Sequence, residues 1–203
     1  MELHNTQAVV AKDTHRFRVI CCGRRWGKTT LAMLEMVGRA VGKKDTRVAY
    51  LATTFAQARD ISWEMLKKYV QPIAVKINES RLEIIIRTQD GGESLLVLRG
   101  WEAVETLRGQ RFDLIVLDEV SSMRNFWLSW QEVIRPTLTD TRGDALFIST
   151  PKGFSHFYDL YNLQETDNDF KSFHFTTYDN PHIPVDEVDK ARSQLTSDRF
   201  EQE

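Results

Sequence analysis

One stretch decides the fold of this chain: Cys21-Cys22-Gly23-Arg24-Arg25-Trp26-Gly27-Lys28-Thr29-Thr30. The apolar run before it, at residues 17–20, predicts a buried strand, and the run after it, at residues 31–37, predicts a helix. A strand, a glycine-containing loop and Gly-Lys-Thr at the start of a helix are the arrangement of a phosphate-binding P-loop. Main-chain N–H groups of such a loop point at an anion, and the helix dipole adds partial positive charge.

The residue types in this loop match tasks on a nucleotide. Lys28 is expected to reach the β- and γ-phosphates of ATP, and the Thr29 hydroxyl is expected to hold Mg²⁺. Cys22 stands where the common pattern has its first glycine, and the two arginines inside the loop predict extra positive charge on the phosphates. The alternative is a chance Gly-Lys-Thr at a helix start. The other residues predicted to bind the nucleotide are Gly23, Arg24, Arg25, Trp26, Gly27 and Thr30.

The composition is that of an ordinary globular domain. The 203 residues can bury a core, and contents of 41% hydrophobic and 28% charged residues are typical of such chains. The net charge of −2 gives no overall basic field, so any contact with nucleic acid has to be local. The adjacent Cys21 and Cys22 suit reduced, buried thiols of a cytosolic protein. Because no apolar run reaches membrane-spanning length, no membrane association is predicted.

A second informative stretch is Leu114-Ile115-Val116-Leu117-Asp118-Glu119, an apolar run that ends in two acids. It predicts a buried parallel strand with a ligand site at its carboxyl end. Asp118 is predicted to bind Mg²⁺ directly or through water, and Glu119 is predicted to orient and deprotonate the attacking water. An acid pair at a strand end is common by itself, and the upstream P-loop makes chance a poor explanation.

The remaining patterns predict alternating strands and helices. A helix at residues 5–12 is expected to have Asn5 as its N-cap. Strands are predicted at residues 47–52, 145–149 and 171–177, a β-hairpin at 81–87 and 93–99, and helices at 55–69, 126–135, 154–163 and 186–195. Together they predict a three-layer α/β domain with a mostly parallel central sheet. Residues 200–203 end the sequence in charged residues, which indicates an excised domain.

Two further polar positions have open interpretations. Gln7 lies ahead of the P-loop strand, where its paired donor and acceptor could read the edge of adenine, and a solvated surface glutamine is an equal alternative. Ser149 and Thr150 end a predicted strand, where hydroxyls could sense the γ-phosphate or the attacking water. A capped turn before the next helix explains this serine and threonine equally well.

Five segments, in order, resemble the ATPase domain of a tailed-bacteriophage terminase large subunit: residues 23–29, 107–109, 117–119, 149–153 and 177–181. The resemblance implies a RecA-like P-loop NTPase of the additional-strand, catalytic-glutamate type. It implies that residues 1–203 form a single P-loop ATPase domain. In that family a nuclease domain with an RNase H-like fold follows, so the nuclease and its metal-binding acids are expected to be absent from this chain.

The resemblance also implies roles for single residues. Arg24 matches an arginine of the P-loop that engages the γ-phosphate within the subunit, and Arg108 matches an arginine finger inserted into a neighbouring subunit. Ser149 and Thr150 match the segment that couples hydrolysis to motion, and Gln7 matches the adenine-reading position. A surface salt bridge is the alternative for Arg108.

The function implied is Mg²⁺-dependent ATP hydrolysis that powers the movement of double-stranded viral DNA into procapsids. The implied partners are a portal protein, a small terminase subunit and a homo-oligomeric ring on the portal, with the isolated domain a monomer. The implied location is the host cytoplasm during virion assembly. A helicase-type or other P-loop ATPase is the first alternative, and a nucleotide-binding assembly module that hydrolyses nothing is the second.

Overall fold

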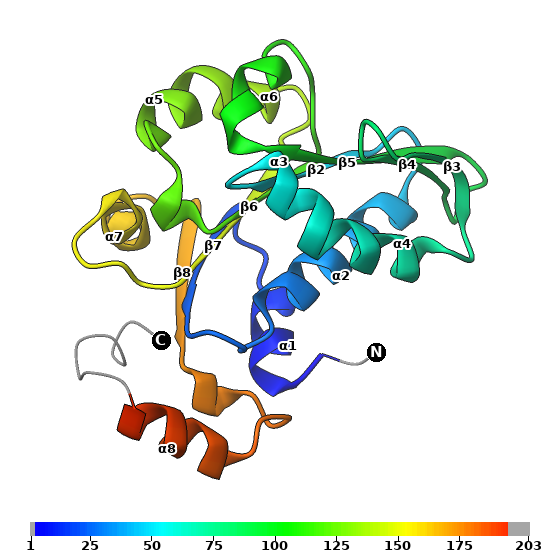
Figure 1. Cartoon of the computed structure of the whole chain (residues 1–203). Coiled ribbons are helices and arrows are strands. Elements are labelled where there is room, and N and C mark those ends of the chain that lie inside the picture. The colour runs from blue at the N-terminus through cyan, green and yellow to red at the C-terminus, as the bar shows by residue number, and fades with distance from the viewer. Residues whose placement is uncertain (1–2, 195–203) are drawn as a thin grey trace.

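A computed structural model describes residues 3–194, and its framework is one sheet with helices on both faces (Figure 1). The eight strands lie in the order β3-β4-β5-β2-β6-β7-β1-β8. The pairs from β5 to β8 in this order are parallel, whereas β3–β4 and β4–β5 are antiparallel. The strands are β1 (Phe17–Cys22), β2 (Arg47–Ala52), β3 (Ala74–Asn78), β4 (Glu83–Arg87), β5 (Glu93–Gly100), β6 (Leu114–Asp118), β7 (Asp144–Ser149) and β8 (Phe170–Phe175).

Helices connect the strands and cover the sheet. The α-helices are α1 (Asn5–Lys12), α2 (Lys28–Gly42), α3 (Phe55–Gln57), α4 (Glu64–Val70), α5 (Phe126–Ser129), α6 (Arg135–Thr137), α7 (His156–Asn162) and α8 (Val185–Gln194). The 3₁₀ segments are η2 (Trp101–Leu107), η3 (Val120–Ser122), η5 (Leu163–Glu165) and η6 (Thr177–Asp179), and the π-helical segments are η1 (Ala58–Trp63) and η4 (Trp130–Ile134). Among residues 3–194, no helix combines the length and apolarity needed to cross a membrane.

The core is divided between the two faces of the sheet. Along β1, Ile20 and Cys22 pack with α1, α2 and α4, whereas Val19 and Cys21 pack with α5 and α7. Because side chains alternate along a strand, a strand buried on both faces reads as a continuous apolar run. This explains the run at residues 17–22 and confirms the predicted three-layer α/β architecture with a mostly parallel sheet.

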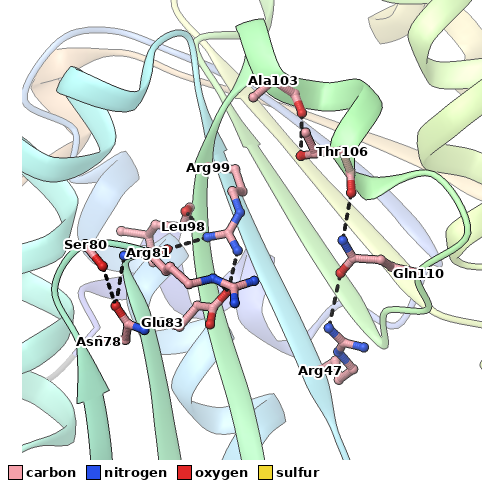
Figure 2. Close-up of polar contacts among 10 residues, drawn as sticks. All are labelled: Arg47, Asn78, Ser80, Arg81, Glu83, Leu98, Arg99, Ala103, Thr106 and Gln110. Atoms are coloured by element: carbon pink, nitrogen blue, oxygen red, sulfur yellow. Dashed lines mark hydrogen bonds and ion pairs between the residues drawn. The ribbon is translucent and has the colours of Figure 1, made fainter.

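The sequence patterns located most elements, including the hairpin that forms β4 and β5. They missed the edge strand β3. The turn after it is closed by Asn78, whose Oδ1 accepts hydrogen bonds from the Ser80 hydroxyl (2.9 Å) and the Arg81 main-chain N–H (3.0 Å) (Figure 2). The residues of this turn were the feature of the sequence that could have indicated the end of a strand here. The apolar–polar alternation of this strand covers only residues 75–78, which is too short to stand out in the sequence, and its central residues are exposed.

Several predicted boundaries were wrong. The N-cap of α1 is His4, not Asn5, because the His4 ring accepts the hydrogen bond from the Gln7 N–H. The predicted helix at 55–69 contains the π-helical segment η1. The helix predicted to end at Arg135-Pro136 continues to residue 137.

The predicted strand at 171–177 ends at residue 175, where a capping box starts η6. The predicted helix at 154–163 begins at residue 156, because Ser155 caps it. The last predicted helix forms over residues 185–194. Its expected final residue, Leu195, and the terminal residues 200–203 lie outside the described part of the chain.

Candidate nucleotide-binding site

The P-loop leaves the carboxyl end of β1, between the ends of β7 and β8. In the sheet Cys21 pairs with Ser149 and Cys22 with Phe175. The loop then turns into α2, whose N-cap is Gly27 with φ of 103°. A Cβ on Gly27 would lie 2.4 Å from Gln7 Nε2, so both the backbone conformation and the packing require glycine here.

Four of the predicted site residues surround one cavity of about 140 Å³: Lys28, Thr29, Asp118 and Glu119. The Lys28 ammonium donates hydrogen bonds to the carbonyls of Cys22 (3.3 Å) and Gly23 (3.1 Å), which places it across the mouth of the loop. The P-loop and the acid pair therefore meet at the carboxyl ends of β1 and β6, where parallel α/β sheets bind their ligands.

Asp118 is a buried carboxylate held by two donors. The Tyr50 hydroxyl donates to Oδ2, and the Glu119 main-chain N–H donates to Oδ1 at 3.0 Å. Burial raises the pKa of Asp118 from 3.8 to about 6, and the hydrogen bond from Tyr50 opposes that rise. Burial also raises the pKa of Tyr50, and the Asp118 charge adds to that rise, so the phenol stays protonated and keeps donating.

The donor set at this cavity fits Mg²⁺. Thr29 supplies a hydroxyl oxygen and Asp118 a carboxylate, and each Asp118 oxygen keeps a lone pair beyond the hydrogen bond it accepts. Mg²⁺ prefers oxygen ligands and is usually held by one or two carboxylates together with substrate phosphates and water. Within residues 3–194 there is no cluster of three or more His, Cys, Asp or Glu side chains able to hold a metal.

Glu119 lies between β6 and η3 in the left-handed conformation, with φ of 57°. The Thr150 hydroxyl donates to its Oε2 at 3.4 Å. The buried Ser149 hydroxyl accepts the Ser121 N–H (3.1 Å) and donates to the Ser121 hydroxyl (2.7 Å). Ser149 at the end of β7 therefore contacts the turn that follows Glu119, and Thr150 contacts Glu119 itself. A displacement of Glu119 or of this turn would alter the hydrogen bonds at the end of β7.

Gln7 lies at a second cavity, of about 840 Å³, beside the P-loop. Its side chain is 3% exposed, so the solvated-surface alternative is wrong. Gln7 Nε2 donates to the Gly27 carbonyl at 3.0 Å, and Gln7 Oε1 accepts the His4 N–H at 3.1 Å. Each polar atom keeps capacity for one further hydrogen bond. The lining of this cavity also includes Thr30 and residues 179–182.

The three central loop residues point in different directions. Arg24 and Arg25 are exposed, whereas Trp26 is fully buried. The Trp26 ring stacks on Phe175 with centroids 4.9 Å apart, and its Nε1 donates to the Thr6 hydroxyl at 3.1 Å. Trp26 therefore anchors the loop to β8 and α1 with its side chain.

Arg108 lies apart from these residues. Its half-exposed side chain donates to Glu105 Oε2 at 3.0 Å and to the Glu132 carbonyl at 3.2 Å, and its Nη2 lies 3.7 Å from Glu132 Oε2. Arg108 lines neither of the two cavities. Within the chain, Arg108 therefore forms surface salt bridges, as the alternative interpretation predicts. The role of Arg108 toward another subunit stays a prediction.

The segment around Arg108 leads away from the P-loop. Figure 2 shows Gln110 joining the Thr106 carbonyl to the Arg47 guanidinium. These bonds are 2.8 Å and 3.1 Å long, and Arg47 is the first residue of β2. Because β2 is parallel to β6, its first residue lies at the sheet edge opposite the site. The chain from η2 to Gln110 therefore runs from the carboxyl ends of the parallel strands, where the site lies, toward their amino ends.

Sequence reasoning missed four residues that support the site: Tyr50, His4, Thr177 and Asn180. Tyr50 was hidden in an apolar strand, and its contact with Asp118 depends on how β2 and β6 are paired. Thr177 and Asn180 donate to the carbonyls of Arg24 and Arg25 at 2.8 Å and 2.6 Å, across more than 150 residues of chain. Only the likeness of residues 177–181 to a family segment pointed there.

Comparisons with solved structures identify related folds. The large terminase ATPase domain of Thermus phage P74-26 matches with a TM-score of 0.79 at 25% identity, over 99% of this chain and 92% of that one. The large terminase of a thermophilic bacteriophage matches with a TM-score of 0.82 over 100% of this chain and 52% of that one. At 17% identity, the second likeness concerns the fold alone.

Comparisons of sequence point the same way. The chain is 28% identical to the terminase large subunit of Thermus phage G20c over 87% of this chain and 42% of that protein. It is 28% identical to the terminase large subunit of Escherichia phage T5 over 93% of this chain and 43% of that protein, so it spans less than half of either relative. The family model for the terminase large subunit, T4-like type, N-terminal, matches residues 19–203. This chain therefore belongs to the family of N-terminal domains of T4-like terminase large subunits.

Proposed function

We propose that this chain is the ATP-hydrolysing motor domain of a viral DNA-packaging enzyme. The observation that carries the proposal is the shared cavity that brings Lys28 and Thr29 of the P-loop to Asp118 and Glu119 of β6 and its end. A phosphate-binding lysine, a magnesium-binding pair and a carboxylate base are the parts that phosphoryl transfer to water requires. The alternative of a nucleotide-binding module without hydrolysis has no use for Glu119.

In this proposal each side chain has one task. Lys28 places its charge on the β- and γ-phosphates, and Arg24 adds a second charge from within the loop. Thr29 and Asp118 hold Mg²⁺, which when bound neutralises charge that develops on the phosphate oxygens. Glu119 accepts the proton of the water that attacks the γ-phosphate in line. Gln7 reads the adenine edge from the larger cavity, and Ser149 and Thr150 pass the change at Glu119 to β7.

The proposal extends to the whole protein. Residues 1–203 form one ATPase domain, and a nuclease domain follows it in the longer protein. The substrate that the motor moves is double-stranded DNA. The partners are a portal protein, a small terminase subunit and further copies of the same subunit in a ring, in the host cytoplasm during virion assembly. Support comes from family membership and from the ATPase-domain relative of matching length.

The test is the Glu119→Gln variant, assayed for phosphate release and for binding of Mg-ATP. The amide keeps the shape of the side chain but cannot accept a proton, so turnover should fall by about 10²-fold or more while binding is retained. Lys28→Ala should weaken binding and turnover together, because its charge acts in both the ground state and the transition state. Glu93→Gln, on an exposed carboxylate of β5, is the matched control. Turnover of Glu119→Gln within a few-fold of the parent would remove the proposed base.

A further inference from the structure

Four successive carbonyls of the P-loop each accept a hydrogen bond from a side chain outside the loop. Thr177 Oγ1 donates to the Arg24 carbonyl (2.8 Å) and Asn180 Nδ2 to the Arg25 carbonyl (2.6 Å). His4 Nε2 lies 2.9 Å from the Trp26 carbonyl, and Gln7 Nε2 donates to the Gly27 carbonyl (3.0 Å). We call these four side chains, His4, Gln7, Thr177 and Asn180, the carbonyl brace.

The partners of His4 fix which of its ring nitrogens carries the proton. A carbonyl can only accept, so Nε2 carries the hydrogen that faces the Trp26 carbonyl. Nδ1 is then free to accept, and it lies 3.0 Å from the Thr6 hydroxyl and 3.5 Å from the Gln7 N–H. This tautomer satisfies every contact of the His4 ring, so this part of the brace needs no charge on the imidazole.

The brace decides which way the loop's N–H groups point. The described peptide bonds are all trans, so the C=O of one residue and the N–H of the next point in opposite directions. Holding the carbonyls of residues 24–26 away from the phosphate side therefore turns the N–H groups of residues 25–27 toward it. The Gly27 carbonyl is held both by Gln7 and by the Leu31 N–H of α2 (3.1 Å), which sets the direction of the Lys28 N–H. A peptide that flipped would instead present a carbonyl oxygen to the phosphate oxygens, and the two would repel.

The donors are themselves held in place. Gln7 Oε1 accepts the His4 N–H at 3.1 Å, which links the donor on α1 to the donor on its N-cap residue. On the other side, Asn180 Oδ1 accepts the His182 N–H at 2.9 Å, which fixes the amide orientation. A capping box between Thr176 and Asp179 shapes the turn that carries Thr177. A donor held this way loses little entropy when it bonds the loop.

We propose that the carbonyl brace holds the P-loop in its anion-binding conformation, so that Thr177 and Asn180, far from the P-loop in sequence, are positioning residues for phosphate binding. The inference rests on the proposed nucleotide binding and adds to it a group of residues that contact no phosphate. It also makes phosphate affinity depend on the segment that follows β8.

The experiment compares isosteric variants in the full chain. Thr177→Val removes one donor without changing side-chain volume, Thr177→Ser restores it, and Asn180→Asp replaces the donor with a carboxylate oxygen. The controls are Thr166→Val, whose hydroxyl donates to the Leu163 carbonyl at 3.4 Å, and His182→Ala, which alters the larger cavity without touching a braced carbonyl. Dissociation constants for Mg-ATP and for Mg-tripolyphosphate, which has no base, are measured by calorimetry alongside the thermal midpoint.

We expect Thr177→Val to weaken both ligands by about threefold to tenfold, the worth of one hydrogen bond. Asn180→Asp should weaken them at least as much, whereas Thr177→Ser and both controls should leave tripolyphosphate binding unchanged. Amide hydrogen exchange at residues 25–28 should quicken in the two weakened variants and in no control. If one variant does not fold, the other carries the test.

The outcomes separate this inference from the proposed function. If the parent chain binds neither Mg-ATP nor tripolyphosphate, the proposed function fails and the inference fails with it. If the parent binds both and the two variants bind within twofold of it, only the brace is overturned. A loss for Mg-ATP without a loss for tripolyphosphate would overturn it too, because it would place the effect at the base instead of the phosphates.

Discussion

At the scale of single residues, the buried Asp118 makes the fold sensitive to pH. Its pKa lies at about 6 instead of 3.8, because burial disfavours the charged form. Between those two values the native state binds more protons than the unfolded state. The free energy of unfolding therefore falls as pH rises through this window. Above it, the folded protein carries the full destabilisation caused by the buried, ionised Asp118 carboxylate, which is the cost of burying this charge.

Asp118→Asn should remove this cost. In the absence of divalent ions, we expect the variant to be more stable than the parent by on the order of 1–3 kcal/mol at about pH 8, and to match it below about pH 4. Urea unfolding at both pH values measures the difference, with the exposed Asp140→Asn as control. An equal stabilisation at both pH values would show that the carboxylate charge is not its source.

Residues with a motif were predictable, and residues that act through tertiary pairing were not. Lys28, Asp118 and Glu119 could be placed in one site from sequence, because a strand end and a helix start bring them to one edge of the sheet. Tyr50 could not, since nothing local in an apolar strand says that its hydroxyl faces Asp118. The contact of His4 with the P-loop could not be predicted either, because a single histidine before a helix is compatible with many roles.

At the scale of elements, an ion pair between a buried arginine and a partly buried glutamate joins β1 to α2, and the arginine also contacts α1. Arg18 of β1 donates to Glu35 Oε2 of α2 at 2.7 Å and to the Val10 carbonyl of α1 at 2.9 Å. The Arg18 side chain is 4% exposed and that of Glu35 is 15% exposed. These contacts fix the helix that starts at the P-loop against the strand that ends there.

Removing one partner should cost more than removing both. Glu35→Ala leaves a buried guanidinium without its carboxylate, which we expect to lower the free energy of unfolding by about 3–5 kcal/mol. The double variant Arg18→Leu/Glu35→Leu should cost less, because no charge stays buried. Denaturant unfolding of the singles and the double measures this. Glu187→Ala, which breaks the exposed pair with Lys190, should cost about 0–1 kcal/mol, and an equal cost for Glu35→Ala would contradict the argument.

Elements with strong periodicity were predicted, and those shaped by context were not. The inner parallel strands β1, β2, β6 and β7 read as apolar runs because both faces are covered. The edge strand β3 did not, because the middle of that strand faces water. The π-helical segments η1 and η4 were also missed, since the periodic pattern of a helix does not distinguish an extra residue in one turn.

At the scale of the whole molecule, the place of Arg108 bears on how subunits cooperate. Its side chain is 53% exposed and belongs to neither cavity of its own chain. We therefore expect the isolated domain to be largely monomeric and a weak ATPase. An arginine finger supplied by a neighbour is worth about 10³–10⁵ in rate in other NTPases.

Mixing variants tests this arrangement. Mixing an Arg108→Ala subunit, which keeps Glu119, with a Glu119→Gln subunit, which keeps Arg108, should restore ATP turnover. The reason is that one site of the mixed assembly then combines an intact Glu119 with an intact Arg108 from the neighbour. Arg111→Ala, on an exposed arginine three positions along, serves as control. Rapid turnover by the dilute monomer, or no rescue where assembly is demonstrated, would leave Arg24 as the leading transition-state arginine.

The strand order also has a consequence for biosynthesis. Of the strands in residues 3–194, β1 leaves the ribosome first, yet its two neighbours β7 and β8 leave last. The segment Phe17–Cys22 therefore lacks both partner strands until residue 149 has been translated, and one of them until residue 175 has been translated. An unpaired apolar strand is prone to aggregation while the chain is being synthesised. A translation product that stops short of β8 would carry the whole P-loop and yet lack the strand on which Trp26 rests.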